Sequence, residues 1–191
     1  VLAANVCFKH LFELAVFIRS KLNAALLQEL YRLRGHPMPE YKAPLREIKF
    51  VMNELLDTPA HYASISSYAE VATPDMVEAI ITEGAKFCEN VLSPLNRVGD
   101  IEGCTRNEDG SVTTPTGFKE AYKQYVEGGW PSLAHNEAHG GQGLPESLGI
   151  VISEMVGASN WSWGMYPGLS LGAMNTIFMH GTEEQKQTFL V

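Results

Sequence analysis

Two histidines and a run of glycines are the residues whose types and spacing come nearest to a known chemical site. His135 and His139 lie four residues apart, as the zinc ligands of a metal-binding helix do. However, the residue directly after the first His is Asn136 and not Glu, and Gly140 and Gly141 break any helix directly after the second His. No third ligand is evident from spacing. We therefore expect no metal site here.

The glycine run could suit a phosphate, because residues 140–143 (GGQG) precede an expected helix whose N-terminus attracts anions. The run lacks the preceding strand and the Lys-Ser/Thr pair of a P-loop. The sequence also contains no GxSxG motif, no Ser-His-Asp order and no carboxylate pair marked out by spacing. Composition and spacing alone therefore do not reveal a chemistry.

These residues belong to a loop over residues 128–145 (GGWPSLAHNEAHGGQGLP), which is too rich in Gly and Pro for helix or strand. Trp130 and Leu133 are its large apolar groups, and a long loop with apolar anchors is usually packed down. We favour a structural crossover between two helices over a binding loop.

Length and charge narrow the class of protein. The 191 residues suffice for one domain with a core, and 45% of them are hydrophobic. The formal charge of −8 argues against nucleic acid as a partner, since affinity for phosphates comes from Lys and Arg. The three cysteines lack CxxC spacing, so we expect no disulfide framework and a cytoplasmic protein. Cys88 falls on an apolar helix face and is interpreted as a core residue, not a nucleophile.

The periodicity of the apolar residues predicts an all-α fold. Leucines at three- and four-residue steps predict an amphipathic helix over residues 1–34, which ends at Gly35-His36-Pro37. We interpret residues 1–37 as an upstream extension that is not part of the natural folded domain. The alternative is a helix that lies on a membrane surface or on a partner. Residues 38–72 form a second segment and residues 73–191 the main helical domain.

Local signals set the expected helix boundaries. A helix begins at Pro44 and closes at Thr58-Pro59, with loop or a short turn of helix up to residue 72. Thr73-Pro74 starts the next helix, and Ser93-Pro94 stops it. The polar stretch 95–115 is expected to be loop, with a small hairpin turn at Asp109-Gly110. Thr116 is expected to cap a helix whose inward residues are Phe118, Tyr122, Tyr125 and Val126.

The C-terminal part is marked by a gap in charge. From Met155 to Thr182 there is no Asp, Glu, Lys or Arg. The polar and small residues in this run argue against a membrane span and favour a buried, irregular helix inside a larger protein. Thr182 to Gln185 form a capping-box pattern, which predicts the start of a final helix. The sequence stops at Val191, directly after the apolar residues Phe189 and Leu190 of that helix, so we expect a truncated chain.

Several motifs together resemble the N-terminal domain of acyl-CoA dehydrogenases. The motifs are GWP at 129–131, EAHGGQGLP at 137–145, ISE at 152–154, HGTEEQKQ at 180–187 and NVLSPLN at 90–96 with Gly99-Asp100. YKAPLR at 41–46 with Phe50 resembles a longer subfamily that includes the 3-methylmercaptopropionyl-CoA dehydrogenases. The resemblance covers roughly residues 38–191 and is jointly specific.

The resemblance implies the helical N-terminal domain of this fold, truncated before the β-domain and the C-terminal helical bundle. It implies a reaction in which a glutamate removes the α-proton of an acyl-CoA thioester and FAD takes the β-hydride. The flavin-contacting segments and the catalytic glutamate are expected beyond Val191, so no catalytic residue is assigned, and Glu137 and Glu154 are not promoted to that role. The family also implies an electron-transfer flavoprotein as partner and a homo-oligomer.

The same resemblance assigns this domain one wall of the acyl pocket. The positions it marks are Trp163, Gly164, Met165, Tyr166, Pro167, Gly168 and Leu171. The charge gap and the glycines agree with an apolar tail lying against this surface. The competing interpretation is core packing, which is favoured for Trp163 and Leu171 and equally weighted for Gly164 and Gly168.

Two functions are therefore carried forward. The first is the N-terminal part of a flavin-dependent acyl-CoA dehydrogenase, inactive on its own because base and flavin site are missing. The second is a stand-alone helical interaction module, in which the uncharged helix and residues 1–34 dock a partner protein. What the reading frame encodes after Val191 would discriminate between them.

Overall fold

The computed structural model describes residues 40–190. The helix expected over residues 1–34 lies outside these residues, as does Val191. Short helices open the described part: α2 (Leu45–Lys49), the π-helical η1 (Phe50–Leu55) and α3 (Thr58–Ser64). The rest comprises α4 (Pro74–Phe87), η2 (Cys88–Leu92), α5 (Ser93–Glu102), β1 (Thr105–Arg106), β2 (Val112–Thr113), α6 (Phe118–Glu127), η3 (Trp130–Ser132), η4 (Glu137–His139), α7 (Glu146–Ser159), α8 (Trp161–His180) and α9 (Glu183–Phe189). The predicted all-α class is confirmed.

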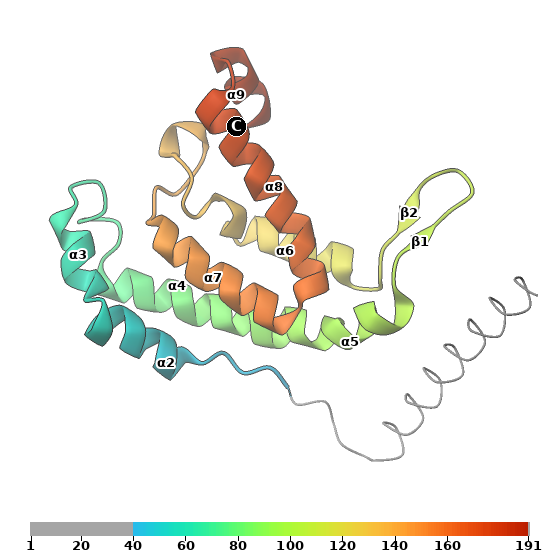
Figure 1. The fold of residues 1–191 in the computed structure, drawn as a ribbon, viewed down its shortest axis with the longest axis horizontal. Coiled ribbons are helices and arrows are strands. Elements are labelled where there is room, and N and C mark those ends of the chain that lie inside the picture. The colour runs from blue at the N-terminus through green and yellow to red at the C-terminus, as the bar shows by residue number, and fades with distance from the viewer. Residues whose placement is uncertain (1–39, 191) are drawn as a thin grey trace, which may run out of the picture. The chain divides into compact units, whose positions relative to one another are not determined.

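A long helical rod built from α4, η2 and α5 carries the other elements (Figure 1). Thr73 caps its start, where its hydroxyl accepts a hydrogen bond from the Met76 amide at 3.4 Å, as predicted. The predicted stop at Ser93-Pro94 is wrong. The rod widens into the π-helical η2, whose register lets the Ser93 amide bond the Cys88 carbonyl, and the helix continues through Pro94. A proline at the first turn of a new helical segment costs no hydrogen bond.

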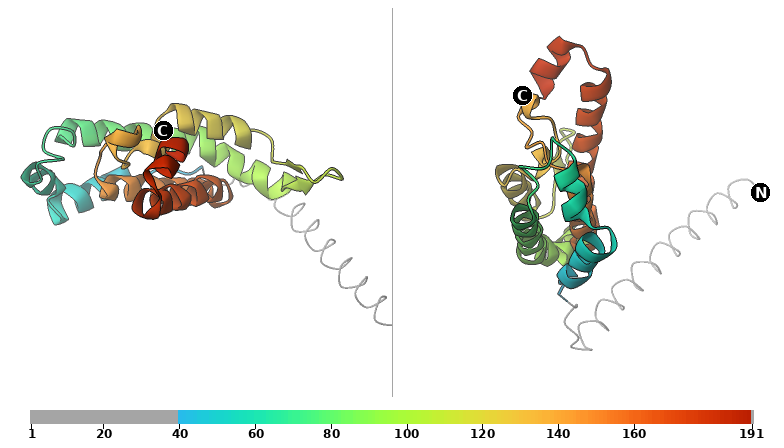
Figure 2. Two further views of the ribbon diagram at one scale, coloured as in Figure 1. Left: turned by 90° about the horizontal axis from the view of Figure 1, so that it is seen from above. Right: turned by 90° about the vertical axis from the view of Figure 1, so that its left-hand side faces the viewer.

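Helix α7 packs along this rod, and α6 lies against another side of it (Figures 1 and 2). The largest fully buried apolar side chains come from η2, α7 and α8, and they are Cys88, Leu92, Leu148, Met155 and Trp163. Close approach at the crossing depends on Gly84, because a Cβ there would stand 2.5 Å from Ile152 Cδ1. Burial of these side chains is the main source of stability for the domain.

The segment before α6 differs partly from the prediction. The hairpin turn at Asp109-Gly110 is confirmed, with β1 and β2 antiparallel and Gly110 at φ +83°. Thr116 does not cap α6. Gly117, at φ +83°, turns the chain into the helix instead, a conformation that a residue with a Cβ adopts at a cost. Val126 is also not inward, since 49% of it is exposed.

The N-terminal segment is fixed to η2 by the side chain of Glu89. The Glu89 carboxylate accepts hydrogen bonds from the Ala43 amide at 2.9 Å and from Lys42 Nζ at 3.1 Å. These contacts lower the pKa of Glu89. The helix predicted to close at Thr58-Pro59 ends slightly earlier, at Leu55. Thr58-Pro59 opens α3, the short turn of helix expected before residue 72, after Asp57 takes a left-handed conformation.

Helix α8 rises from the rod toward α9, and it is continuous from Trp161 to His180 (Figure 1). The expected irregularity is therefore wrong, because the helix runs through Pro167 without a break. Within the described residues only Trp163 and Pro167 of α8 are buried, and the expected burial inside a larger protein stays a prediction. The predicted capping box at Thr182 and Gln185 is confirmed by both of its hydrogen bonds.

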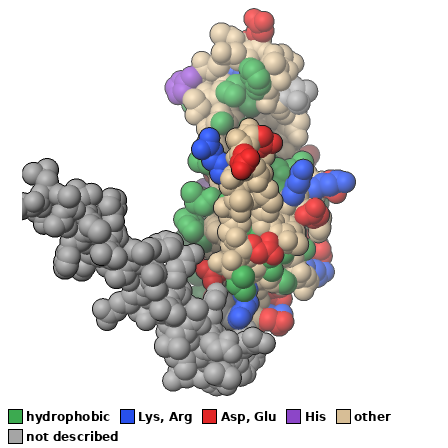
Figure 3. Space-filling model, turned by 90° about the vertical axis from the view of Figure 1, so that its right-hand side faces the viewer, with side chains coloured by type: hydrophobic (Ala, Val, Ile, Leu, Met, Phe, Trp, Pro, Cys, Tyr) green, Lys and Arg blue, Asp and Glu red, His purple; other side chains and the backbone are tan. Residues whose placement is uncertain are grey.

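Between residues 40 and 190, no helix combines the length and apolar character that crossing a bilayer requires. On the face drawn in Figure 3, acidic, basic and apolar side chains are interspersed.

Candidate functional site

The α7–α8 junction positions the candidate site, and a buried asparagine builds it. Asn160 Oδ1 accepts hydrogen bonds from the Trp163 amide at 3.1 Å and from the Ser162 hydroxyl at 3.0 Å. Its Nδ2 donates to the Leu92 carbonyl at 3.1 Å. One side chain thus caps α8 and ties it to the end of η2. Sequence reasoning missed this residue, although an Asn directly before an apolar run is a helix-start signal.

A hollow of about 230 Å³ lies beside the first half of α8. Tyr125 of α6 and Val156 and Gly157 of α7 contribute to its lining, together with Trp161. Five of the seven residues marked from the sequence also line it: Gly164, Met165, Pro167, Gly168 and Leu171. Its walls are therefore mainly apolar side chains and bare helix backbone, which suits an apolar guest.

The two glycines at this hollow have different surroundings. A Cβ on Gly164 would lie 3.3 Å from Val156 Cγ1, so this position already serves the close packing of α8 on α7. A Cβ on Gly168 would meet nothing within 4 Å. Core packing therefore accounts for the glycine at 164 but not for the glycine at 168.

Trp163 and Tyr166 lie elsewhere. Trp163 is fully buried, and its Nε1 donates to the Phe118 carbonyl at 3.1 Å. Its ring stands edge-on to Tyr125, with centroids 5.4 Å apart. Both residues line a second hollow, of about 400 Å³, which lies between α6 and α8 and includes Ser170. The structure thus divides the seven residues between two sides of α8.

The loop after α6 is packed down by its predicted anchors. Leu133 is buried, and the Trp130 ring stacks on Phe87 with centroids 6.5 Å apart. The backbone amides of residues 141–144 bond the carbonyls of Asn136, Ser132, His135 and Leu133 at 2.9–3.1 Å. These amides are engaged inside the loop, so they offer no cradle for a phosphate.

The two histidines of this loop belong to no cluster of candidate metal ligands within the described part of the chain. Across residues 40–190, no group of three or more His, Cys, Asp or Glu side chains is placed to hold a metal ion. His139 instead meets the ring of Phe178 edge-on, with centroids 5.9 Å apart. The contact joins the loop to the end of α8.

Burial raises the pKa of Tyr125, which lines the first hollow, and of Cys88, which lies in the core. Desolvation, followed by the effect of Tyr122, raises the pKa of Tyr125 to about 12. Desolvation also raises the pKa of the Cys88 thiol to about 11, so the thiolate needed for nucleophilic attack is scarce at neutral pH. The described lining of this hollow contains no Asp, Glu, His, Lys or Arg that could act as an acid or a base.

Comparison with known proteins identifies the family. Residues 75–191 match the model of the acyl-CoA dehydrogenase N-terminal domain. The chain belongs to the acyl-CoA dehydrogenase family. It is 37% identical over 150 residues to 3-methylmercaptopropionyl-CoA dehydrogenase of Ruegeria pomeroyi, a match that covers 78% of this chain and 25% of that protein. It is 31% identical over 153 residues to butyryl-CoA dehydrogenase of Syntrophomonas wolfei, again with 78% and 25% covered.

The match confirms the family resemblance, and α4 to α9 are the helices of an acyl-CoA dehydrogenase N-terminal domain. The chain spans about a quarter of the length of the curated relatives it matches.

Proposed function

We propose that this domain supplies one wall of the acyl-binding pocket of a flavin-dependent acyl-CoA dehydrogenase, which converts an acyl-CoA thioester to its 2-enoyl-CoA. The observation that carries the proposal is the apolar hollow along α8, where Gly168 leaves bare helix backbone open. The named relatives are dehydrogenases of acyl-CoA thioesters. An apolar surface without charge suits the acyl tail and not the CoA nucleotide.

In this proposal the described residues bind and orient the substrate. Val156, Met165 and Leu171 would contact the acyl tail and keep water from it, which strengthens any charge effect at the reacting carbons. Holding the tail in one place also lowers the entropic cost of reaction. Glu137 and Glu154 are exposed and do not line the hollow, so neither is assigned as the base.

The flavin supplies hydride acceptance when it is bound. The described residues do not fit it: the glycine loop, their best candidate for a pyrophosphate cradle, has its amides engaged internally. We therefore derive no step through the flavin. For the whole protein we propose FAD as cofactor, an electron-transfer flavoprotein as electron acceptor and a homo-oligomeric state.

A helical interaction module is the second candidate, because α8 exposes 73% of Leu169 and 69% of Met179. The two candidates differ in what the hollow binds. A module needs no small ligand there, whereas an acyl-pocket wall must distinguish an acyl thioester from free CoA.

The test uses Trp161, which lines the hollow, as a fluorescent reporter. We expect butyryl-CoA and longer acyl-CoAs, but not free CoA, to change the tryptophan emission of the chain, and Trp161→Phe to abolish the change. Gly168→Leu fills the hollow and should remove the response. Gly172→Leu is the matched control, since a Cβ there also meets nothing within 4 Å but the residue does not line the hollow.

Two results would overturn the proposal. One is an equal response to free CoA and acyl-CoA. The other is an equal loss from the Gly168 and Gly172 variants, which would mean that the response does not come from the hollow.

A further inference from the structure

The first hollow, whose walls are mainly apolar, includes a tyrosine that carries a polar hydroxyl. Tyr125 of α6 lines this hollow, and only 5% of the residue is exposed. Its ring is held by aromatic neighbours: it stands edge-on to Trp163 with centroids 5.4 Å apart, and its centroid lies 6.0 Å from that of Phe87. Close packing on these sides keeps the ring in place, so the hydroxyl is fixed at the hollow.

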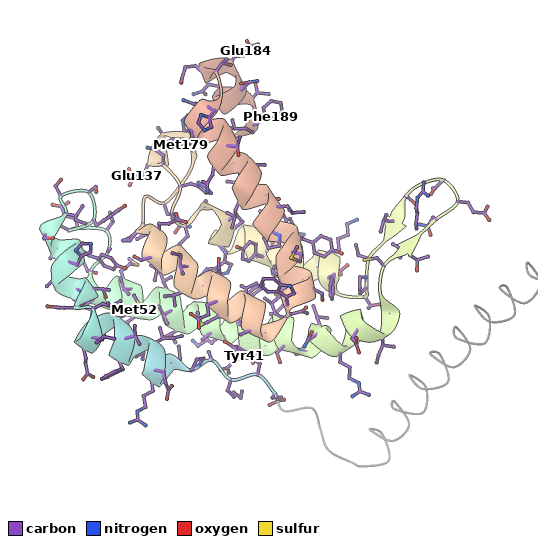
Figure 4. The ribbon with its side chains drawn as sticks, in the orientation of Figure 1. Tyr41, Met52, Glu137, Met179, Glu184 and Phe189 are labelled. Carbon is purple, nitrogen blue, oxygen red and sulfur yellow. The ribbon has the colours of Figure 1, made fainter. Side chains whose placement is uncertain are left out.

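This hydroxyl has no hydrogen-bond partner within the described part of the chain. A buried tyrosine usually has one: Tyr62 is 3% exposed, and its hydroxyl bonds that of Ser147 at 2.7 Å. The Tyr125 hydroxyl is not sealed from solvent either. Among the described side chains, the sealed polar atoms that lack a partner are His139 Nδ1 and Oη of Tyr41, which is labelled in Figure 4. The small accessible part of Tyr125 therefore includes its hydroxyl, which opens into the first hollow.

Whatever fills the hollow must satisfy this hydroxyl. The other polar groups of the lining belong to Ser153 and Trp161, and both residues are exposed, so bulk water can satisfy them. Tyr125 instead depends on water that enters the hollow or on an atom of a bound ligand. A purely hydrocarbon tail would displace that water and leave the hydroxyl unpaired, which weakens binding.

Packing alone does not account for the hydroxyl. A phenylalanine at this position would make the same ring contacts with Trp163 and Phe87 and would leave no polar group at the hollow. The hydroxyl therefore needs a reason other than the core, and a ligand atom that accepts its hydrogen bond is one.

We propose that Tyr125 determines specificity, and that the preferred acyl-CoA carries a hydrogen-bond-accepting oxygen in its tail where the tail passes this residue. The inference rests on the proposed function and adds a class of substrate to it. Burial raises the pKa of Tyr125 to about 12, so the phenol keeps its proton at neutral pH and acts as the donor.

The lining also restricts the kind of acceptor. The described residues of the hollow include no Lys, Arg or His, so a carboxylate in the tail would be buried without a cation. A neutral ether, hydroxyl or carbonyl oxygen fits this lining. A thioether sulfur accepts hydrogen bonds only weakly, so oxygen is the better partner for the phenol.

The test compares octanoyl-CoA with its isosteric ethers, in which oxygen replaces the methylene group at position 4, 5, 6 or 7 of the acyl chain. Binding to the full chain is followed by the change in Trp161 fluorescence. An oxygen that loses water without gaining a partner should weaken binding. At the position that meets Tyr125, the ether should bind at least as tightly as octanoyl-CoA.

Tyr125→Phe should change the affinities of the two ligands in opposite directions. The favoured ether should bind roughly tenfold more weakly, because its oxygen loses the donor, whereas octanoyl-CoA should bind somewhat more tightly, because no hydroxyl is left unpaired. Tyr122→Phe is the matched control, since Tyr122 lies on the same helix but lines the second hollow, and it should change neither affinity. Urea unfolding checks the fold, and Tyr125→Phe should not lower the stability, because no hydrogen bond within the described residues is lost.

The outcomes separate this inference from the proposed function. If octanoyl-CoA binds but all the ethers bind more weakly than it does, the inference is overturned and the acyl pocket stands. The same holds if the ether preference persists in Tyr125→Phe or is lost equally in Tyr122→Phe. If neither octanoyl-CoA nor any ether changes the fluorescence, the proposed function fails and this inference fails with it.

Discussion

The glycines of the loop and the glycines of α8 stand in opposite surroundings. A Cβ on Gly141 would lie 2.0 Å from the His135 carbonyl oxygen, inside a loop whose amides bond its own carbonyls. A Cβ on Gly168 or Gly172 would meet nothing within 4 Å. In the loop, glycine is required by the fold. On α8, glycine weakens an ordinary helix and needs another reason, for which the proposed acyl pocket provides one at Gly168.

The largest effect is expected from Gly141→Ala. The clashing atom belongs to the backbone, which cannot move without breaking the loop, so we expect a loss of about 3 kcal/mol or a failure to fold. Gly140→Ala is the control: its φ of +79° is strained but its Cβ has space, so the loss should be about 1 kcal/mol. Urea unfolding measures both. Equal losses would show that the crowding at Gly141 is not what fixes the loop.

Local signals predicted much of this fold. The helix starts at Thr73 and Thr182 and the turn at Asp109-Gly110 were read correctly, because neighbouring residues decide a cap or a turn. The passage of the helix through Pro94 was missed. It depends on the widening at η2 and on α7 and α8 packing against it, neither of which a local pattern records.

The division of the marked residues between two hollows was not predicted, and helix geometry explains it. The resemblance marked the unbroken run 163–168, but successive residues of a helix point about 100° apart and cannot share one face. Gly164, Met165 and Gly168 therefore line one hollow, while Trp163 and Tyr166 line the other. If residues 163–168 had been treated as one continuous helix, the residues that line the first hollow could have been separated from those that line the second.

A smaller effect is expected from Asn160→Ala, which tests how α8 rather than the loop is held. The change removes the acceptor for the Trp163 amide and the donor to the Leu92 carbonyl, both buried. We expect a loss of about 2 kcal/mol. Asn136→Ala removes an exposed cap of the loop, a bond of 2.8 Å from the Ala138 amide, and should cost about 1 kcal/mol or less. A loss from Asn136→Ala as large as that from Asn160→Ala would mean that burial of the cap does not matter.

The smallest change in stability has the opposite sign. Gly172→Ala and Gly168→Ala each replace glycine in an exposed helix interior with space for the methyl group, so each should stabilise the domain by about 1 kcal/mol. Gly164→Ala should gain less, because its Cβ meets Val156 Cγ1 at 3.3 Å. Urea unfolding measures these gains, and acyl-CoA titration of Trp161 fluorescence separates the two open positions. If the hollow holds an acyl tail, Gly168→Ala weakens acyl-CoA binding while Gly172→Ala does not. Only at Gly168 does the more stable variant then bind the ligand less tightly. Destabilisation by Gly172→Ala would contradict the open surroundings from which the comparison starts.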